Sequence, residues 1–248
     1  MRVAVAGATG NIGARTVTHL EKDGHEAVGI SKSLGVDLVT GDGLEAALRG
    51  VDAVVDTISS PPVGREETVD YFGTTTRNLL DAEASVGVGH HVLLSIVGID
   101  RVEGNAHYAG KREQERLVSE GRVPWTIVPA TQFFDFAELA SGWAEKDGVS
   151  HIAPLLMQPI APDDIAAILA ELAVGEPQGR YADVAGPETQ DLIDMVRRTN
   201  AVRGREVRLV PTWSAMFDES MAGNVMLPGD NMRIAPMTFE QWLAAGGQ

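Results

Sequence analysis

The 248-residue sequence contains no cysteine, which excludes disulfides, thiolate catalysis and zinc–thiolate sites. It has no apolar run near the roughly 20 residues that a membrane-spanning helix needs. Basic residues are few, 20 against 35 acidic ones, and the net charge of −15 argues against a surface for nucleic acid or anionic membranes. We therefore expect a small-molecule substrate as the partner, with no nucleic acid and no membrane.

Common catalytic signatures are missing as well. The sequence has no Ser-His-Asp hydrolase elbow and no phosphate-binding lysine loop. His90 and His91 are adjacent at the start of an expected strand, so their rings point to opposite faces and cannot chelate one metal ion. We expect no metal site. Because the first expected strand begins at residue 2, a secretory signal has no room, and we expect a cytoplasmic protein.

The most informative stretch lies at the N-terminus. A short apolar run, Val3–Ala6, predicts a buried strand, and Gly7, Gly10 and Gly13 follow it at a spacing of three. A helix pattern begins at once. Strand, glycine turn and helix together aim free backbone N–H groups and the positive end of a helix dipole at a phosphate. Gly7 allows the sharp turn, Gly10 the close approach of a pyrophosphate and Gly13 the packing of helix on strand. This stretch predicts a dinucleotide site.

The first half of the chain alternates strand and helix patterns, which indicates repeated β-α-β units and a doubly wound parallel sheet. In such a sheet ligands bind beyond the carboxyl ends of the strands. The connection from Ile30 to Val36 is too short for a crossover helix and is either a loop or a single turn. After the first strand, further strands are expected at Glu26–Ile30, Val36–Val39, Ala53–Ile58, His91–Val97 and Trp125–Val128, and helices at Asn11–Lys22, Leu44–Leu48, Glu66–Val86 and Ala109–Ser119.

After Pro129 the alternation weakens. We expect a helix after Ala161, a strand at Arg180–Ala185, a helix from Gly186 to about Arg198, a strand at Val207–Val210 and a helix at Thr238–Ala245. Most of the aromatic and thioether bulk also lies here: Phe133, Phe134, Phe136, Trp143, Met157, Trp213, Met216, Met221 and Met226. We therefore expect one domain over residues 1–248, a monomer or homodimer, in which residues from about 130 onward contribute a small C-terminal helical lobe for the substrate.

The sequence Gly7-Ala8-Thr9-Gly10-Asn11-Ile12-Gly13 resembles the N-terminal signature of atypical short-chain dehydrogenase/reductases, in particular the NmrA-like NAD(P)-binding group. The resemblance implies a Rossmann fold and covers roughly residues 1–190. Further segments that carry it, in the family's order and spacing, are Val39–Asp42, His91–Asp100, His107–Lys111, Val123–Pro129, Pro159–Ala167 and Tyr181–Glu188.

The resemblance implies a nicotinamide dinucleotide, most often NADPH. Its contacts are then expected at the turn residues Gly7, Thr9, Gly10, Asn11, Ile12 and Gly13, at Asp42 beside the adenine, at Thr57, Ile58 and Ser59 on the nicotinamide side, and at Lys111. The residues themselves favour the same cofactor. An NAD site usually has Asp or Glu at the end of the second strand. Here Ser31, Lys32 and Ser33 follow that strand, and a cation between two hydroxyls suits a 2′-phosphate.

The catalytic residues are less determined. In the wider family, a Tyr four residues before a Lys donates the proton, and the Lys lowers the pKa of that Tyr and holds the ribose. Here Lys111 is preceded at that distance by His107, whereas Tyr108 stands three residues before it. Positions three and four apart share one side of a helix, so either side chain can reach the cleft. An imidazole with an ordinary pKa near 6.5 is a suitable acid. Both residues could equally be structural.

Ser95, at the end of a buried strand, is expected either to hold a substrate carbonyl or to bond its own backbone. Two functions then remain open. One is an NADPH-dependent reductase of a small, largely apolar carbonyl or quinone-like substrate, which the apolar second half favours. The other is a redox sensor that binds the dinucleotide without turnover, which the absence of Tyr at position 107 keeps open. Fold alone does not decide between them.

Overall fold

The computed structural model describes residues 1–60, 64–213 and 217–247, so Met216 of the expected apolar lobe lies outside the described residues. The chain divides into two compact units. Unit 1 consists of Met1–Ile96, Ala106–Pro129 and Ile165–Ala182, and unit 2 of Val97–Asn105, Ala130–Asp164 and Asp183–Gln248.

Unit 1 is built on a sheet in the order β5-β4-β3-β1-β2, and the short β9 pairs with β5. The pairs β1–β2, β1–β3 and β3–β4 are parallel. The central strands β1, β3 and β4 are short, rich in Val, Ala and Leu and almost entirely buried, as expected for a parallel sheet covered on both faces. Their bounds are β1 Arg2–Ala6, β2 Glu26–Ile30, β3 Ala53–Asp56, β4 His90–Ile96, β5 Trp125–Ala130 and β9 Gly179–Arg180.

The strand order reverses at β1, because β2 lies on one side of it and β3 on the other. Ala6, the last residue of β1, pairs with Ile30 of β2 and with Asp56 of β3. The chain therefore leaves all three strands at the same level, at the point where doubly wound sheets bind their ligands.

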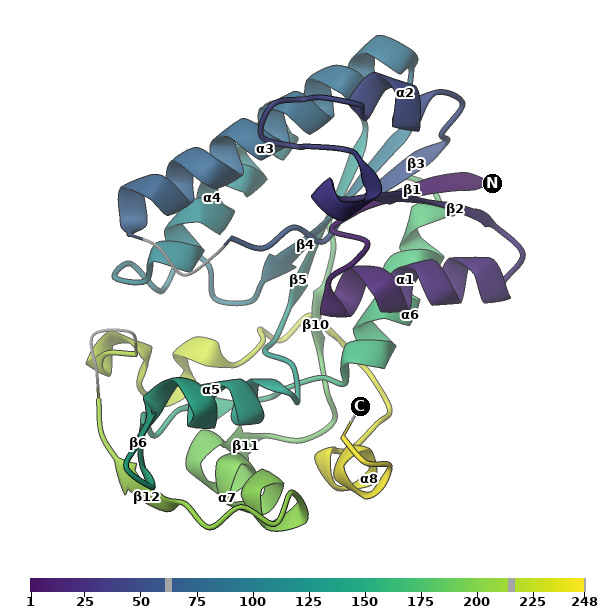
Figure 1. Ribbon diagram of the computed structural model, residues 1–248. Coiled ribbons are helices and arrows are strands. Elements are labelled where there is room, and N and C mark those ends of the chain that lie inside the picture. The colour runs from purple at the N-terminus through teal and green to yellow at the C-terminus, as the bar shows by residue number, and fades with distance from the viewer. Residues whose placement is uncertain (61–63, 214–216, 248) are drawn as a thin grey trace. The chain divides into compact units, whose positions relative to one another are not determined.

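Helices cover both faces of this sheet. In Figure 1, α3 and α4 run side by side over one face, and α1 covers the other. Phe72 and Leu79 of α3 are fully buried in the hydrophobic core between this helix and the sheet. The helices are α1 Asn11–Lys22, α2 Leu44–Leu48, α3 Arg65–Val86, α4 Ala106–Glu120 and α6 Pro162–Ala173, with a single 3-10 turn, η1, at Lys32–Leu34.

Unit 2 combines short strands with helices around an aromatic core. Phe134, Phe239 and Trp242 pack against one another with ring centroids 5.3 to 5.9 Å apart. Here β12 pairs with β7 and β7 with β6, β11 pairs with β8, and β10 pairs with β13 and with Ala130. The elements are α5 Phe136–Ala144, β6 Glu145–Lys146, β7 Val149–Ile152, β8 Leu156–Met157, β10 Asp183–Ala185, β11 Gln190–Asp191, α7 Leu192–Val202, β12 Arg208–Pro211, η2 Glu219–Met221, η3 Gly223–Met226, β13 Met232–Ile234 and α8 Phe239–Ala244.

The strand expected at Val36–Val39 is wrong. The backbone N–H of Asp37 donates to the Asp42 carbonyl, and that of Gly41 to the Asp37 carbonyl, so the segment folds back on itself as a turn. The Asp37 carboxylate also accepts from the Val39 N–H, a side-chain bond that favours turns over strands. The connection from Ile30 is the single turn η1.

Two later expectations also need correction. The strand expected at Arg180–Ala185 is two short strands, β9 and β10. The helix expected from Gly186 begins only at Leu192, because the Asp191 side chain accepts from the Asp194 N–H and so caps the helix there.

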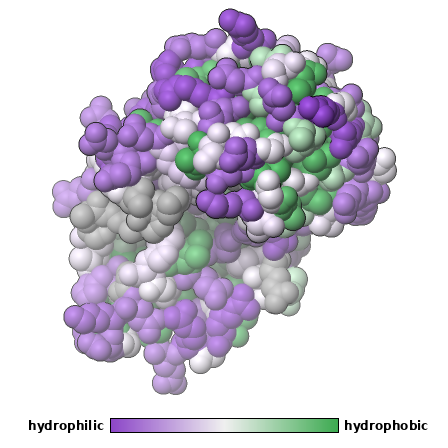
Figure 2. All heavy atoms as spheres, turned by 45° about the horizontal axis from the view of Figure 1, so that its top comes forward, coloured by the Kyte–Doolittle hydropathy of each residue, from purple (hydrophilic) through white to green (hydrophobic). Residues whose placement is uncertain are grey.

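The visible surface is largely hydrophilic. In the view of Figure 2, hydrophilic side chains cover much of the visible face and hydrophobic ones gather in patches between them. Within the described ranges, no helix has the length and apolar character that crossing a membrane requires.

Candidate functional site

The glycine turn after β1 has the geometry of a phosphate cradle. Gly7 has φ +81°, a conformation that L side chains rarely adopt. A Cβ on Gly13 would lie 2.1 Å from the Gly7 carbonyl oxygen, so only glycine allows α1 to pack this closely. A Cβ on Gly10 would meet only that same oxygen, at 3.2 Å. The protein itself therefore requires Gly7 and Gly13 far more strictly than Gly10.

The N-terminus of α1 is suited to an anion. Gly10 is the N-cap, its backbone is extended, and no side-chain hydrogen bond caps the helix. The first turn contains no acidic residue that would repel a phosphate. The backbone amides of the first helical turn and the helix dipole thus favour a negative group beside Asn11, Ile12 and Gly13. Thr9 lies in the same turn and is exposed. These residues fit the pyrophosphate of a dinucleotide.

The segment after β3 adjoins this turn. The Thr57 backbone N–H and hydroxyl both donate to the Ala6 carbonyl, at 3.0 and 2.8 Å. The Thr57 side chain therefore joins the ends of β1 and β3. Ile58 is buried, and Ser59 is exposed.

The residues after β2 form a polar corner. The Ser31 and Ser33 hydroxyls are hydrogen-bonded at 3.0 Å. The Lys32 side chain is 85% exposed and its ammonium lies 3.0 Å from the Asp37 carboxylate. The hydrogen bond from Lys32 lowers the pKa of Asp37 below its ordinary value, so this carboxylate is ionised at neutral pH. Sequence reasoning found no carboxylate beside this corner, because Asp37 reaches Lys32 only through the turn that replaces the expected third strand.

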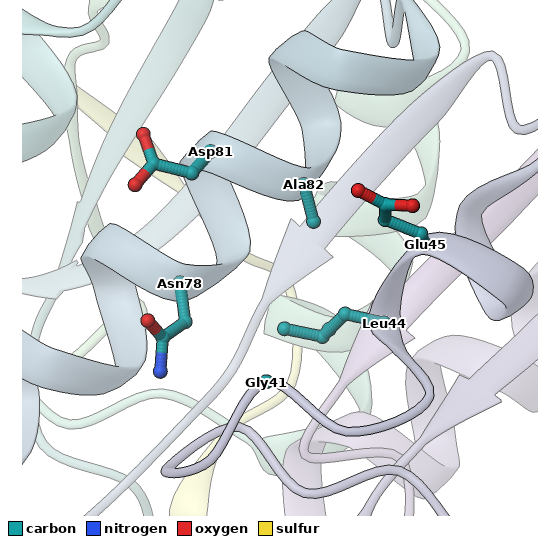
Figure 3. Close-up of a pocket in the computed structure, with 6 residues that line it drawn as sticks. All are labelled: Gly41, Leu44, Glu45, Asn78, Asp81 and Ala82. Carbon is teal, nitrogen blue, oxygen red and sulfur yellow. The ribbon is translucent and has the colours of Figure 1, made fainter.

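Asp42 lies at the end of that turn and is exposed. Next to it is an open pocket of about 210 Å³, lined by Gly41, Leu44 and Glu45 and by Asn78, Asp81 and Ala82 of α3. Figure 3 shows the lining side chains of α2 and α3, with Leu44 extending toward α3. Its two carboxylates, Glu45 and Asp81, disfavour a phosphate group, and the glycine turn does not contribute to it.

Lys111 is buried in α4, with 4% of its surface exposed. Its ammonium donates to the Leu94 carbonyl at 2.8 Å and to the Gln114 side-chain oxygen at 2.7 Å. It also lies 5.2 Å from the centre of the Phe72 ring. Burial lowers the pKa of Lys111 to about 8, with the carboxylates of Asp56 and Glu115 acting in the opposite direction. Lys111 therefore carries its charge at neutral pH and loses it in mildly alkaline solution.

His107 and Tyr108 both lie in the first turn of α4. Burial, aided by the charge of Lys111, lowers the pKa of His107 to about 4. Its ring packs edge-on against Phe72 at a centroid distance of 5.5 Å. The ordinary pKa assumed from the sequence does not hold, and the imidazole is neutral at pH 7. Tyr108 is buried.

Ser95 does not share hydrogen-bond partners with Lys111. Its hydroxyl donates to the Glu115 carboxylate at 2.5 Å, and the other oxygen of that carboxylate accepts from Arg180 at 2.7 Å. The hydroxyl hydrogen is thereby directed to Glu115, the partner that sequence reasoning missed. Ser95 would need to exchange this partner to hold a substrate oxygen.

Two further residues escaped sequence reasoning. Asp56 is the last residue of β3, and Gln114 lies three residues after Lys111 on α4; both are fully buried. The Gln114 amide donates to the Asp56 carboxylate at 2.7 Å. A carboxylate at a strand end was a visible signal, but the partner lies 58 residues away.

Known proteins share the sequence pattern of residues 7–174 and the fold of the chain. Residues 7–174 match the model of a family described as NAD(P)H-binding. No curated protein matches the sequence. Among solved structures, a dTDP-4-dehydrorhamnose reductase from Bacillus anthracis in complex with NADP is 16% identical, with 98% of this chain and 97% of that chain covered and a TM-score of 0.74.

Two other reductases are similar in structure. An NADPH-dependent quinone oxidoreductase from Escherichia coli, complexed with NADPH, is 20% identical over 85% of this chain and 78% of its own, with a TM-score of 0.66. A triphenylmethane reductase from Citrobacter sp. is 17% identical over 86% of this chain and 79% of its own, with a TM-score of 0.64. At these identities the likeness concerns the fold, and it confirms the doubly wound Rossmann-like fold expected from the sequence.

Proposed function

The chain belongs to the NAD(P)H-binding family, and from that premise we propose that it is an NADPH-dependent oxidoreductase acting on a small, largely apolar carbonyl or quinone-like substrate. The family match covers residues 7–174 and includes every residue expected to hold the cofactor. The observation that carries the proposal is that unit 1 contains both a glycine turn without a side-chain cap and the buried Lys111. The cytoplasm is the proposed location.

Each part of unit 1 has a role in this proposal. Gly10 and the first turn of α1 hold the pyrophosphate, Ile58 and Ser59 line the nicotinamide side, Asp42 meets the adenine, and Lys111 donates to the ribose. When bound, the dinucleotide supplies the hydride. The alignment of the ends of β1, β2 and β3 supports a single cofactor along this edge.

We assign the preference for NADPH to Ser31, Lys32 and Ser33. A 2′-phosphate offers Lys32 a stronger anionic partner than a neutral ribose hydroxyl does. Asp37 now pairs with Lys32, so the phosphate has to replace or share that carboxylate. The preference therefore depends on the balance between Lys32, which attracts the phosphate, and Asp37, which repels it.

Tyr108 is the proposed proton donor to the substrate oxygen. The neutral state of His107 at pH 7 supports this choice, since an imidazole with a pKa of about 4 carries no extra proton to give. Lys111 follows Tyr108 by three residues on α4, and an ammonium on the same side of a helix would stabilise a phenolate and so assist proton release from the tyrosine. In this role Tyr108 would give its proton to the carbonyl oxygen of the substrate, and the resulting phenolate would be reprotonated from solvent.

The substrate class is proposed from two observations. The segments of unit 2 after Ala130 are rich in aromatic and methionine side chains, which suit an apolar ligand. Two structural neighbours are named as a quinone oxidoreductase and a triphenylmethane reductase. We therefore propose that residues from about 130 onward provide the substrate lobe.

One observation favours a second function. The position that the family fills with a catalytic tyrosine holds His107, whose pKa of about 4 makes it a poor acid. A redox sensor that binds the dinucleotide and signals through a partner needs no acid at this position.

The experiment that separates the two functions follows NADPH absorbance in the presence of a panel of aldehydes, ketones and quinones. Oxidation of NADPH that depends on one of these compounds, with formation of the reduced product, supports the reductase. Tight NADPH binding without turnover on any compound contradicts the reductase and supports the sensor. A Gly10→Val variant, which should not bind NADPH, is the control: any NADPH oxidation that it still shows does not arise at the proposed site.

A further inference from the structure

A continuous line of buried hydrogen bonds crosses unit 1 from the loop after β3 to Lys111. The Ile58 backbone N–H donates to one oxygen of the Asp56 carboxylate at 2.9 Å. The other oxygen accepts from the Gln114 amide at 2.7 Å. The Gln114 side-chain oxygen in turn accepts from the Lys111 ammonium at 2.7 Å. Asp56 and Gln114 have no exposed surface.

The line has a fixed direction. A carboxylate only accepts hydrogen bonds and an ammonium only donates them, whereas an amide has one end of each kind. Gln114 must therefore turn its NH2 group toward Asp56 and its oxygen toward Lys111. The reversed amide would place oxygen against carboxylate and NH2 against ammonium. Asp56 thus determines, through Gln114, where a cation is held on α4.

The groups around the Lys111 ammonium restrict it further. The Leu94 carbonyl accepts a second of its hydrogens, and the Phe72 ring lies at 5.2 Å. Leu94 follows Leu93, the residue that pairs with Asp56, so Lys111 is held at the level where β3 ends. An ammonium has three donors, and two of them are committed to Gln114 and Leu94.

We propose that Asp56 and Gln114 are positioning residues that hold Lys111 in register with the cofactor loop Thr57–Ser59. The inference rests on the proposed role of Lys111 in binding the nicotinamide ribose. The Asp56 carboxylate thereby links the two elements proposed to contact the cofactor. One of its oxygens holds the loop Thr57–Ser59, and the other holds Lys111 through Gln114. Movement of either element relative to the other then breaks a buried hydrogen bond to a charged group, which is costly.

Exchange of the two side-chain types tests this inference. In Asp56→Asn, the new amide that accepts from Ile58 turns its NH2 group toward the NH2 group of Gln114. If Gln114 rotates to avoid this clash, its own NH2 group faces the Lys111 ammonium instead. In Gln114→Glu, a second carboxylate faces Asp56. The double variant Asp56→Asn/Gln114→Glu restores the pattern, because the new amide at position 56 donates to the new carboxylate at position 114, and that carboxylate accepts from Lys111. Its charge is the same as that of the wild type.

NADPH affinity measured by titration calorimetry is the first readout. We expect each single variant to bind NADPH about tenfold more weakly, as for the loss of one hydrogen bond to a charged group, and the double variant to recover most of that loss. Gln178→Glu is the matched control, because Gln178 is exposed in the same unit and lies outside this line. It should bind NADPH like the wild type.

The pH dependence of NADPH binding is the second readout, and a purely structural role would not move it. Affinity should fall as the pH rises through about 8, where Lys111 loses its charge. The charged and titratable groups that face Lys111 are Asp56 on β3, His91 on β4, and His107 and Glu115 on α4. Loss of the Asp56 carboxylate should move the midpoint to lower pH in Asp56→Asn. In the double variant the carboxylate is closer to the ammonium, and the midpoint should lie above that of the wild type.

The outcomes separate this inference from the proposed function. If Gly10→Val keeps full NADPH affinity, the proposed site itself is wrong. If Gly10→Val loses binding while the single variants keep both the affinity and the midpoint of the wild type, only the positioning role is overturned. Should Asp56→Asn fail to fold, as judged by circular dichroism, the double variant decides. A folded double variant whose midpoint is at or below that of the wild type contradicts the inference.

Discussion

Gly10 and Gly13 differ in what a side chain would meet, and that difference separates binding from folding. Gly13 packs against the Gly7 carbonyl within a distance that no side chain tolerates. Gly10 has extended backbone that any residue adopts, and a Cβ there makes one tight contact. In the proposed site, glycine at position 10 therefore serves the ligand more than the fold, because a side chain there would occupy the place proposed for the pyrophosphate.

We expect Gly10→Val to remain folded and to lose dinucleotide binding, whereas Gly13→Ala should lower the melting temperature. Titration calorimetry with NADPH measures the first effect and circular dichroism the second. Unchanged affinity in Gly10→Val would refute the assignment of the pyrophosphate to this turn. The control is a variant that adds side-chain bulk in α1 outside the glycine turn. Ala14→Val serves for this and should bind NADPH like the wild type. Gly24→Ala would not serve, because the backbone φ of +82° at position 24 strains any side chain.

Lys32 and Asp37 give opposite expectations for cofactor choice. Lys32→Ala should weaken NADPH by up to about tenfold, corresponding to one charge-assisted hydrogen bond of about 1.5 kcal/mol, and leave NADH unchanged. Asp37→Asn removes the carboxylate that occupies Lys32 and should strengthen NADPH selectively. Equal changes for both cofactors in either variant would exclude this corner as the site of the 2′-phosphate.

Tyr108 and His107 are separated by single substitutions once a turnover substrate is known. Tyr108→Phe should slow turnover by about 100-fold, the contribution of a general acid, with the NADPH affinity preserved. His107→Ala should leave turnover within a few-fold of the wild type at pH 7, since burial keeps this imidazole neutral. If His107→Ala carries the large loss and Tyr108→Phe does not, the proton donor has been assigned to the wrong residue.

At the scale of elements, the strands and helices of unit 1 follow from local patterns. The strand β2, the helix α1 and the short α2 have the bounds that the local sequence pattern predicts, because each contains one local run of apolar residues. Val36–Val39 looks equally apolar, yet the Asp37 side chain and the five-residue spacing to Asp42 close it as a turn. The contacts that sequence reasoning missed, such as Gln114 with Asp56 and Arg180 with Glu115, join elements far apart in the chain. Their formation depends on which helix turn faces which strand end, and no local pattern contains that information.

A buried ion pair joins α3 to β4, and it should make stability fall as the pH rises. Glu83 and His91 are fully buried with 2.9 Å between the carboxylate and Nδ1. Burial raises the pKa of Glu83 above 4.5. Burial opposes charge on His91, but the attraction and hydrogen bond of Glu83 outweigh it and raise the pKa of His91 above 6.5. The folded state therefore binds more protons than the unfolded chain from about 4.5 upward, and the stabilisation decreases as the pH increases.

Chemical denaturation of the wild type and of Glu83→Leu/His91→Leu over a range of pH measures this effect. The unfolding free energy of the wild type minus that of the double variant should decrease steadily with rising pH. A difference that increases with pH would contradict the raised pKa values of this pair. Glu83→Gln alone should cost about 3 kcal/mol, because it leaves a buried imidazole without its ionic partner.

At the scale of the whole molecule, the residues expected to hold the dinucleotide all lie in unit 1. A ligand that binds only the folded state stabilises it by mass action, about 2.7 kcal/mol at a concentration 100 times its dissociation constant. For a chain of this length, that free energy raises the melting temperature by roughly 5–10 °C. NADPH should therefore shift the transition that unfolds unit 1, in a scan at constant scan rate and protein concentration.

The same scan on Gly10→Val distinguishes specific binding from a general effect of an anionic cofactor. The wild-type chain carries a net charge of −15, so loose association of a polyanion is disfavoured, and a stabilisation must come from a built site. The variant should show no shift with NADPH while its melting temperature without ligand stays near that of the wild type. If the chain melts in two steps, only the step of unit 1 should respond. A shift of equal size in Gly10→Val would place the stabilising ligand outside the glycine turn.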